Sequence, residues 1–208
     1  MGRLFPDEDT AERLLAEGEA KNPGPWAAHS RNVAQAARNI AGRCPGMDAG
    51  EAYVLGLLHD IGRRDGPNGL RHIPGGCRYC LSLGFPKAAQ ICLTHSFPGS
   101  QKIEEAQGEW DCTEEEYQWT ARRLSQARYD EYDRLIQLCD ALAPVSGFCL
   151  MEKRLVDVAL RHGVNALTLQ KWKALFGIKG EFESRMRLSV YDVLPGAVEN
   201  TFSGAGPS

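Results

Sequence analysis

Apolar residues recur along most of the chain at the three- and four-residue spacing of an amphipathic helix. Neither the strict alternation of a half-buried strand nor an internal repeat is found over any convincing stretch. This pattern predicts an all-α fold. The expected helices cover residues 9–20, 26–40, 48–62, 77–83, 87–95, 113–125 leading into 135–142, 150–162, 168–176 and 180–190.

Capping and helix-breaking residues mark several of the expected boundaries. Two pairs have the spacing of a capping box, namely Asp48 with Glu51 and Thr113 with Glu116. The Pro-Gly segment Asn22–Pro25 should break the chain before the second helix, and Pro144 should end the helix that contains residues 135–142. These signals agree with the helical periodicity on either side of them.

The chain is long enough for one domain with a full-sized hydrophobic core. We expect a central part over residues 26–144, a surface loop or lid at 96–112, a helical extension at 145–195 and a flexible tail at 196–208. The extension contains apolar helix faces and exposed charge but no ligand-like cluster, so it is interpreted as scaffold. His162 precedes Gly163 at a helix C-terminus, where an imidazole is locally favourable, and it is given no catalytic role.

Composition removes several classes of function. A formal net charge of -3 gives no global basic footprint for nucleic acid or an anionic membrane, and no uncharged apolar run is long enough to cross a bilayer. The seven cysteines are an odd, scattered set, which predicts reduced thiols in a cytoplasmic protein. Cys77 and Cys80 form an isolated C-x-x-C without a second pair, which favours free thiols over a structural zinc site.

Candidate chemistry begins at His59-Asp60, which follow an apolar run at the end of a predicted helix. An imidazole beside a carboxylate can ligate one divalent cation, although such a pair alone is weak evidence. His29 lies on the apolar stripe of the preceding helix, and Asp140 lies in the apolar run 135–142. An unpartnered buried carboxylate costs several kcal/mol, so Asp140 needs a cation or strong hydrogen bonds. The four residues could satisfy one another through a metal ion.

The order of these residues resembles the H…HD…D pattern of the HD superfamily of metal-dependent phosphohydrolases. The resemblance includes the apolar lead-in Val54–Leu58 and the following Ile61-Gly62, and it extends over about Trp26–Pro144. It implies an HD-domain helical bundle with additional C-terminal helices. It also implies that the four positions bind one metal, with Asp60 able to bridge to a second.

Two further histidines bear on the number of metals. Family members with dinuclear centres carry an additional His after the HD loop and another at a following helix end, which His72 and His95 match here. The resemblance therefore implies a second ion held by Asp60, His72 and His95. The alternatives are a solvated His72 in its Gly/Pro loop and a His95 favoured only by the helix dipole. Residues 84–95 also resemble, more loosely, the branch that includes bacterial diadenosine tetraphosphate hydrolases.

The implied reaction is attack of a metal-activated water on a phosphoester or phosphoanhydride of a nucleotide or related small metabolite. Divalent ions are the implied cofactors, with Fe, Mn, Co, Ni, Zn and Mg all open. Asp60, Arg63 and Arg64 are the catalytic candidates, because a guanidinium can hold phosphate bidentately. A solvated basic turn, or an ion pair with Asp65, is the alternative reading of the two arginines. The sequence does not predict an oligomeric state.

Two rival functions come from other classes. The same ligand set in this fold can hold a di-iron centre that oxidises a polyol or phosphonate. A nucleotide-sensing module without turnover is the other rival, although sensors tend to lose ligands and this chain has the complete set. Oxygen consumption and phosphate release would separate the three functions.

Overall fold

A computed structural model describes residues 3–203, which contain helices and no strand. The α-helices are Glu8–Lys21 (α1), Pro25–Ala41 (α2), Ala49–Leu58 (α3), His72–Ser82 (α4), Pro86–Thr94 (α5), Glu114–Gln126 (α6), Glu131–Asp140 (α7), Met151–His162 (α8), Thr168–Met186 (α9) and Ala197–Phe202 (α10). Three 3-10 helices join them, namely Ile61–Asp65 (η1), Ile103–Glu105 (η2) and Val190–Val193 (η3). The predicted all-α fold is confirmed.

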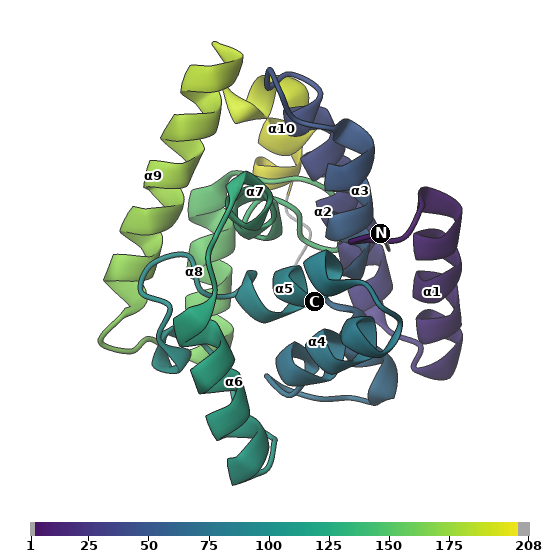
Figure 1. The fold of residues 1–208 in the computed structure, drawn as a ribbon. Helices are drawn as coiled ribbons and strands as arrows, with labels where there is room; N and C mark the ends of the chain where they lie inside the picture. The colour runs from purple at the N-terminus through teal and green to yellow at the C-terminus, as the bar shows by residue number, and fades with distance from the viewer. Residues whose placement is uncertain (1–2, 204–208) are drawn as a thin grey trace.

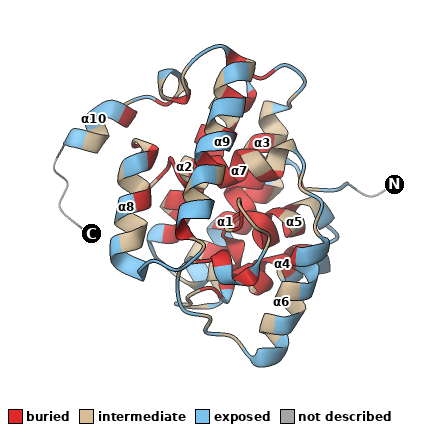
Figure 2. Ribbon diagram, turned by 90° about the vertical axis from the view of Figure 1, so that its left-hand side faces the viewer, coloured by how far each residue is buried: buried red, intermediate tan, exposed pale blue. Residues whose placement is uncertain are grey.

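The core lies between α2, α3, α5 and α7. Buried residues gather on the inner helices, whereas α6, α8 and α10 carry mostly half-buried and exposed residues (Figure 2). α1 and α9 lie on opposite sides of the molecule (Figure 1). Gly56 lets α2 and α3 approach closely, because a Cβ at that position would lie 2.5 Å from the Ala34 Cα. This contact brings the helix that carries His29 against the helix that precedes His59.

The chain on either side of His59-Asp60 differs from prediction in two places. α3 ends at Leu58, earlier than the predicted end near Gly62, so His59 and Asp60 lie in the turn just beyond it. α4 begins at His72 and not at Cys77, so His72 is helical and does not belong to a loop. Pro74 misled the prediction, since a proline within the first turn interrupts no helical hydrogen bond.

The capping signals were largely correct. Thr113 and Glu116 form a complete capping box at the start of α6. Asp48 accepts from the Glu51 N–H, but its own N–H donates to the Tyr132 hydroxyl, so only half of that box forms. Each cap fixes where its helix begins.

The C-terminal helices differ from prediction in two places. α9 is continuous through Gly177 and Gly180, where two helices were expected, because its buried face, which includes Leu175 and Phe182, outweighs the low helix propensity of glycine. α10 occupies part of the tail predicted at 196–208, and residues 204–208 lie outside the described part of the chain.

The predicted lid at 96–112 is a structured loop. Buried Glu105 accepts hydrogen bonds from the backbone N–H groups of Gly99 and Ser100 and from the Ser100 hydroxyl, each at 2.6 Å. A buried carboxylate that accepts three hydrogen bonds holds the loop in one arrangement.

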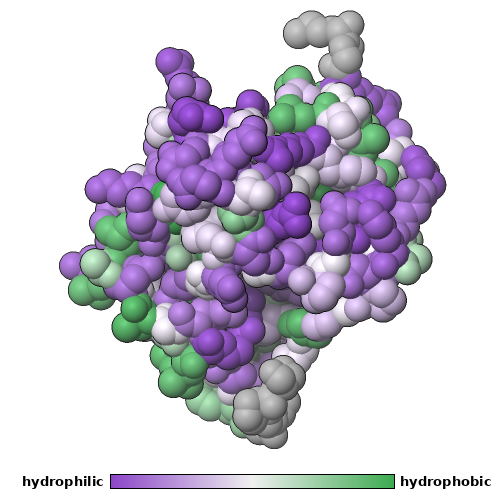
Figure 3. All heavy atoms as spheres, turned by 90° about the horizontal axis from the view of Figure 1, so that it is seen from below, coloured by the Kyte–Doolittle hydropathy of each residue, from purple (hydrophilic) through white to green (hydrophobic). Residues whose placement is uncertain are grey.

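The surface and the helices both bear on membrane insertion. The face seen from below is mostly hydrophilic, with separate hydrophobic patches near its edges (Figure 3). Within residues 3–203, no helix combines the length and apolar character that crossing a membrane would require.

Candidate metal centre

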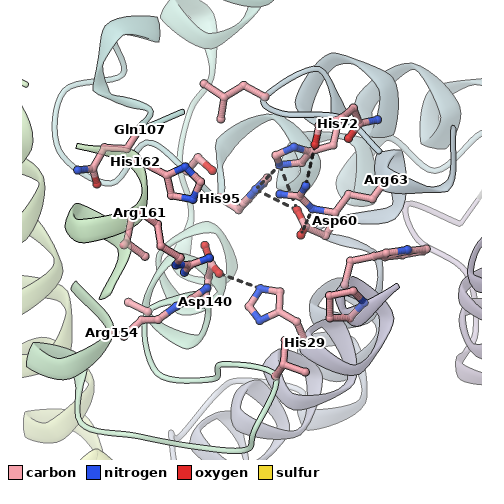
Figure 4. Close-up of a pocket in the computed structure, with 18 of the residues that line it drawn as sticks. His29, Asp60, Arg63, His72, His95, Gln107, Asp140, Arg154, Arg161 and His162 are labelled. Carbon is pink, nitrogen blue, oxygen red and sulfur yellow. Dashed lines mark hydrogen bonds and ion pairs between the residues drawn. The ribbon is translucent and has the colours of Figure 1, made fainter. Parts of the chain in front are cut away.

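Five of the six residues predicted as metal ligands line one pocket (Figure 4), and the sixth, His59, forms a group with His29 and Asp140. All of the six except His29 lie at or just beyond helix ends, and His29 projects from within α2. They form two groups, and within each group the ligand atoms lie within 4.8 Å of one another. The first group is His29, His59 and Asp140, and the second is Asp60, His72 and His95. The same two groups were expected to hold the two ions.

Gly62 positions the second group. A Cβ there would lie 2.0 Å from the His72 carbonyl oxygen and 2.4 Å from the Gly76 nitrogen, so only glycine lets η1 pass the start of α4 at this distance. His72 is thereby held against Asp60, with its Nε2 at 3.1 Å from Asp60 Oδ1. Close packing thus explains why a glycine, Gly62, follows soon after His59-Asp60.

Backbone carbonyls orient all four imidazoles in the same way. In each, Nδ1 lies within hydrogen-bond distance of a carbonyl oxygen, in the pairs His29–Ala143 (2.7 Å), His59–Gly56 (2.8 Å), His72–Gly69 (2.6 Å) and His95–Cys92 (2.9 Å). A carbonyl can only accept, so Nδ1 carries the proton and the Nε2 of a neutral ring presents its lone pair. This is the orientation that metal-binding histidines adopt.

The Nε2 atoms have the surroundings expected of metal ligands. His59 Nε2 is buried without a hydrogen-bond partner among the described residues. The Nε2 atoms of His72 and His95 face each other at 3.4 Å, where two lone pairs repel unless a proton or a cation lies near them. A buried unsatisfied nitrogen is costly, and a cation would remove that cost. The residues present therefore fit a metal ion.

Protonation of the buried histidines is disfavoured. Burial lowers the pKa of His59, and it lowers the pKa of His95 to about 3 despite the nearby charge of Asp60. Both imidazoles are therefore neutral near pH 7, as metal binding requires.

Both carboxylates remain ionised. Burial would raise the pKa of Asp60, but Arg63 and His72 hold it well below its usual range. Asp140 Oδ1 lies 3.0 Å from His29 Nε2, and a proton or a cation between these atoms lowers the pKa of Asp140 against the effect of burial. Asp60 Oδ1 lies 3.5 Å from His95 Nε2 and 4.0 Å from His59 Nε2, which places this carboxylate between the two groups.

The two arginines after the HD pair have different surroundings. Arg63 lines the pocket and donates from Nε to Asp60 Oδ2 at 2.6 Å and from Nη1 to the Asn68 carbonyl at 3.2 Å. Arg64 lies outside the pocket lining, with its guanidinium 4.0 Å from the centre of the Tyr79 ring. The ion pair considered with Asp65 does not form, since Asp65 pairs with Lys21 at 2.6 Å. Of these two arginines, only Arg63 lines the pocket.

The C-terminal extension, which was predicted to be scaffold, also borders the pocket. The pocket has a volume of about 480 Å³, and part of its lining comes from α8 and α9. The basic residues of that part are Arg154, Arg161, His162 and Lys171. One signal was available in the sequence, because Arg154 and Arg161 are seven residues apart and so lie on one helix face.

The chain was compared with known proteins. A family model described as HD domain matches residues 26–145, which is more than half of the chain and includes all six candidate ligands. Searches of curated proteins and of solved structures returned no match. The looser resemblance of residues 84–95 to diadenosine tetraphosphate hydrolases is not among these findings and stays a prediction. The match covers more than half of the chain, and the two His/Asp groups lie within it. The chain therefore belongs to the HD domain family.

Proposed function

We propose that this chain is a metal-dependent phosphohydrolase that uses two divalent ions to cleave a phosphoester or phosphoanhydride in a nucleotide or a related small metabolite. Proteins of the HD domain family are typically metal-dependent phosphohydrolases. The observation that carries the proposal is the buried, unpartnered Nε2 of His59, which lies beside the ligand atoms of His29 and Asp140. All four imidazoles direct Nδ1 to a backbone carbonyl, which leaves each Nε2 for a metal ion.

The two residue groups divide the ligand roles. His29, His59 and Asp140 would hold one ion, and His72 and His95 would hold the other, with Asp60 shared between them. When bound, such ions supply an activated water and neutralise charge on the phosphoryl oxygens. Imidazole-rich sets favour Fe, Mn, Co, Ni or Zn over Mg, although Mg stays in the panel to be tested.

The remaining groups of the pocket orient and bind. Arg63 holds Asp60 through Nε, and its remaining N–H groups can donate to a phosphoryl oxygen. Arg63 would therefore position a ligand carboxylate and bind substrate at the same time. A pocket of about 480 Å³ suits a ligand of nucleotide size.

We also propose a cytoplasmic location. All seven cysteines are free, and all but Cys112 are buried. Free, buried thiols are typical of proteins from a reducing compartment.

Metal removal tests the proposed function. The full chain is stripped with a chelator, reloaded singly with Mn, Fe, Co, Ni, Zn or Mg, and assayed for phosphate release from nucleotides, dinucleoside polyphosphates and sugar phosphates. We expect no release without metal and release after reloading, with oxygen excluded. Full activity in excess chelator would overturn the proposal, and turnover that requires oxygen would assign an oxygenase instead.

A further inference from the structure

Four basic residues of α8 and α9, which we call the cationic wall, line the pocket with the metal groups. Its members are Arg154, Arg161, His162 and Lys171. We propose that the cationic wall binds a second anionic group of the substrate, so that the substrate is a small metabolite with one anion at each end. This inference rests on the proposed function, because it assigns the other end of the substrate to the metal groups.

The geometry separates two ends of the pocket. Arg154, Arg161 and His162 lie on one side, and Asp60 and Arg63 lie on the other (Figure 4). A phosphate beside Asp60 would therefore leave the cationic wall free for a different group of the same molecule.

The cations of the wall lack carboxylate partners. Among the ion pairs of residues 3–203, none includes Arg154, Arg161 or Lys171. Lys153, by contrast, lies on the same helix as Arg154 and pairs with Asp157 at 3.8 Å. Unpaired cations that face one pocket repel each other, and a bound anion would remove that repulsion.

The electrostatic environment of the wall agrees with this geometry. Burial lowers the pKa of His162, and the charges of Arg161 and Arg154 lower it further. Burial also lowers the pKa of Lys171, against the opposing effect of Asp140 and Glu105. A bound anion would oppose both shifts by favouring the protonated forms.

Two hydrogen bonds hold the wall against the structured loop 96–112. Gln107 Nε2 donates to the Gly163 carbonyl at 2.8 Å, and Asn165 Nδ2 donates to the Glu104 carbonyl at 2.9 Å. Gly163 ends α8 with a φ of 77°, which places the following residues within reach of the loop. The backbone at the end of α8, which carries Arg161 and His162, is therefore positioned before a ligand arrives.

The part of the pocket that accompanies these cations is less polar. Leu155 and Val158 of α8 and Leu175 of α9 line the same pocket. Apolar lining suits the uncharged middle of a substrate, and charged groups suit its ends. A metabolite with two anionic groups and a compact, less polar centre matches this arrangement.

The experiment compares a short series of alkanediol bisphosphates with the alkyl monophosphates of equal chain length. The series samples several distances between the two anions. For each compound, kcat/KM is measured with reloaded enzyme, and Kd is measured by calorimetry with metal-free protein. The test variant is Arg154→Gln/Arg161→Gln, and the matched control is Arg43→Gln/Arg122→Gln, two exposed arginines outside the pocket.

We expect the wild type and the control to prefer at least one bisphosphate over its monophosphate by about 10-fold to 100-fold in kcat/KM, since charged hydrogen bonds have that worth. The test variant should lose this preference and keep its activity on monophosphates. The Kd of that bisphosphate for metal-free protein should rise by a similar factor in the test variant alone.

The two proposals fail in different ways. Hydrolysis without any preference for a bisphosphate, or with a preference that the test variant retains, would overturn the cationic wall and leave the hydrolase proposal intact. Absence of hydrolysis, with bisphosphate binding that the test variant loses, would overturn the hydrolase proposal and support the wall as an anion site.

Discussion

The two sides of the pocket are built in different ways. On the side of the metal groups, the candidate ligands are buried except for the half-buried Asp140, and each imidazole is fixed by a carbonyl oxygen. On the side of α8 and α9, Arg161 and His162 are exposed and Arg154 is half-buried. Metal ligation requires particular residue types in a dry, fixed setting, whereas binding of an anion requires only cations that can reach it. The first kind of site therefore leaves a motif in the sequence and the second does not.

The largest expected effect lies at the point shared by both metal groups. Replacing Asp60 with Ala should empty both groups and lower phosphate release by about three orders of magnitude or more, because it removes a ligand of each ion. Metal analysis and phosphate release measure the two outcomes on one sample. Asp65→Ala is the matched control, since Asp65 lies five residues further along the chain, exposed and paired only with Lys21. An Asp60→Ala protein that retains two ions per chain would contradict the assignment.

The next effect tests the number of ions. Replacing His95 with Ala removes one neutral ligand of the second group, so metal content should fall from about two ions per chain to about one, with a loss of about 100-fold in rate. The first ion should remain, because His29, His59 and Asp140 are unchanged. His162→Ala serves as the control, because it removes a histidine from the opposite side of the same pocket and should leave metal content unchanged. If the wild-type protein never holds more than one ion, the two-ion hypothesis is wrong and the enzyme is mononuclear.

The difference between the two sides of the pocket also explains which parts of the fold and the site could be predicted from the sequence. The candidate metal ligands were identified from the order and apolar setting of residues such as His29 and Asp140, because a buried polar residue in an apolar stripe requires a partner. The helix that begins at His72 was missed, since Pro74 and two glycines dominate its composition. The position of Arg154 and Arg161 in the pocket lining was missed, because an arginine on an amphipathic helix has the same local pattern whether or not a pocket lies beside it.

A smaller effect on kcat/KM should distinguish the two neighbouring arginines that follow His59-Asp60. Arg63→Gln should lower kcat/KM by about 10-fold, because it frees Asp60 Oδ2 and removes a cation from the pocket. Arg64→Gln should leave kcat/KM within about 2-fold, because that side chain packs on Tyr79 outside the pocket. Steady-state kinetics on the best substrate decide the matter. Equal losses in both variants would show that the basic turn acts as a unit and that the placement of Arg64 is wrong.

The smallest effect concerns glycine, which has opposite roles in the two regions. Gly62→Ala should destabilise the protein by about 1–3 kcal/mol, since its new methyl group would overlap the backbone at the start of α4. Gly180→Ala in α9 should instead stabilise it by about 0.5–1 kcal/mol, because no atom lies within 4 Å of the added Cβ and alanine is the better helix former. Denaturant unfolding of the metal-free variants measures both changes without any contribution from bound ions. If Gly180→Ala were as destabilising as Gly62→Ala, the continuity of α9 through Gly180 would be contradicted.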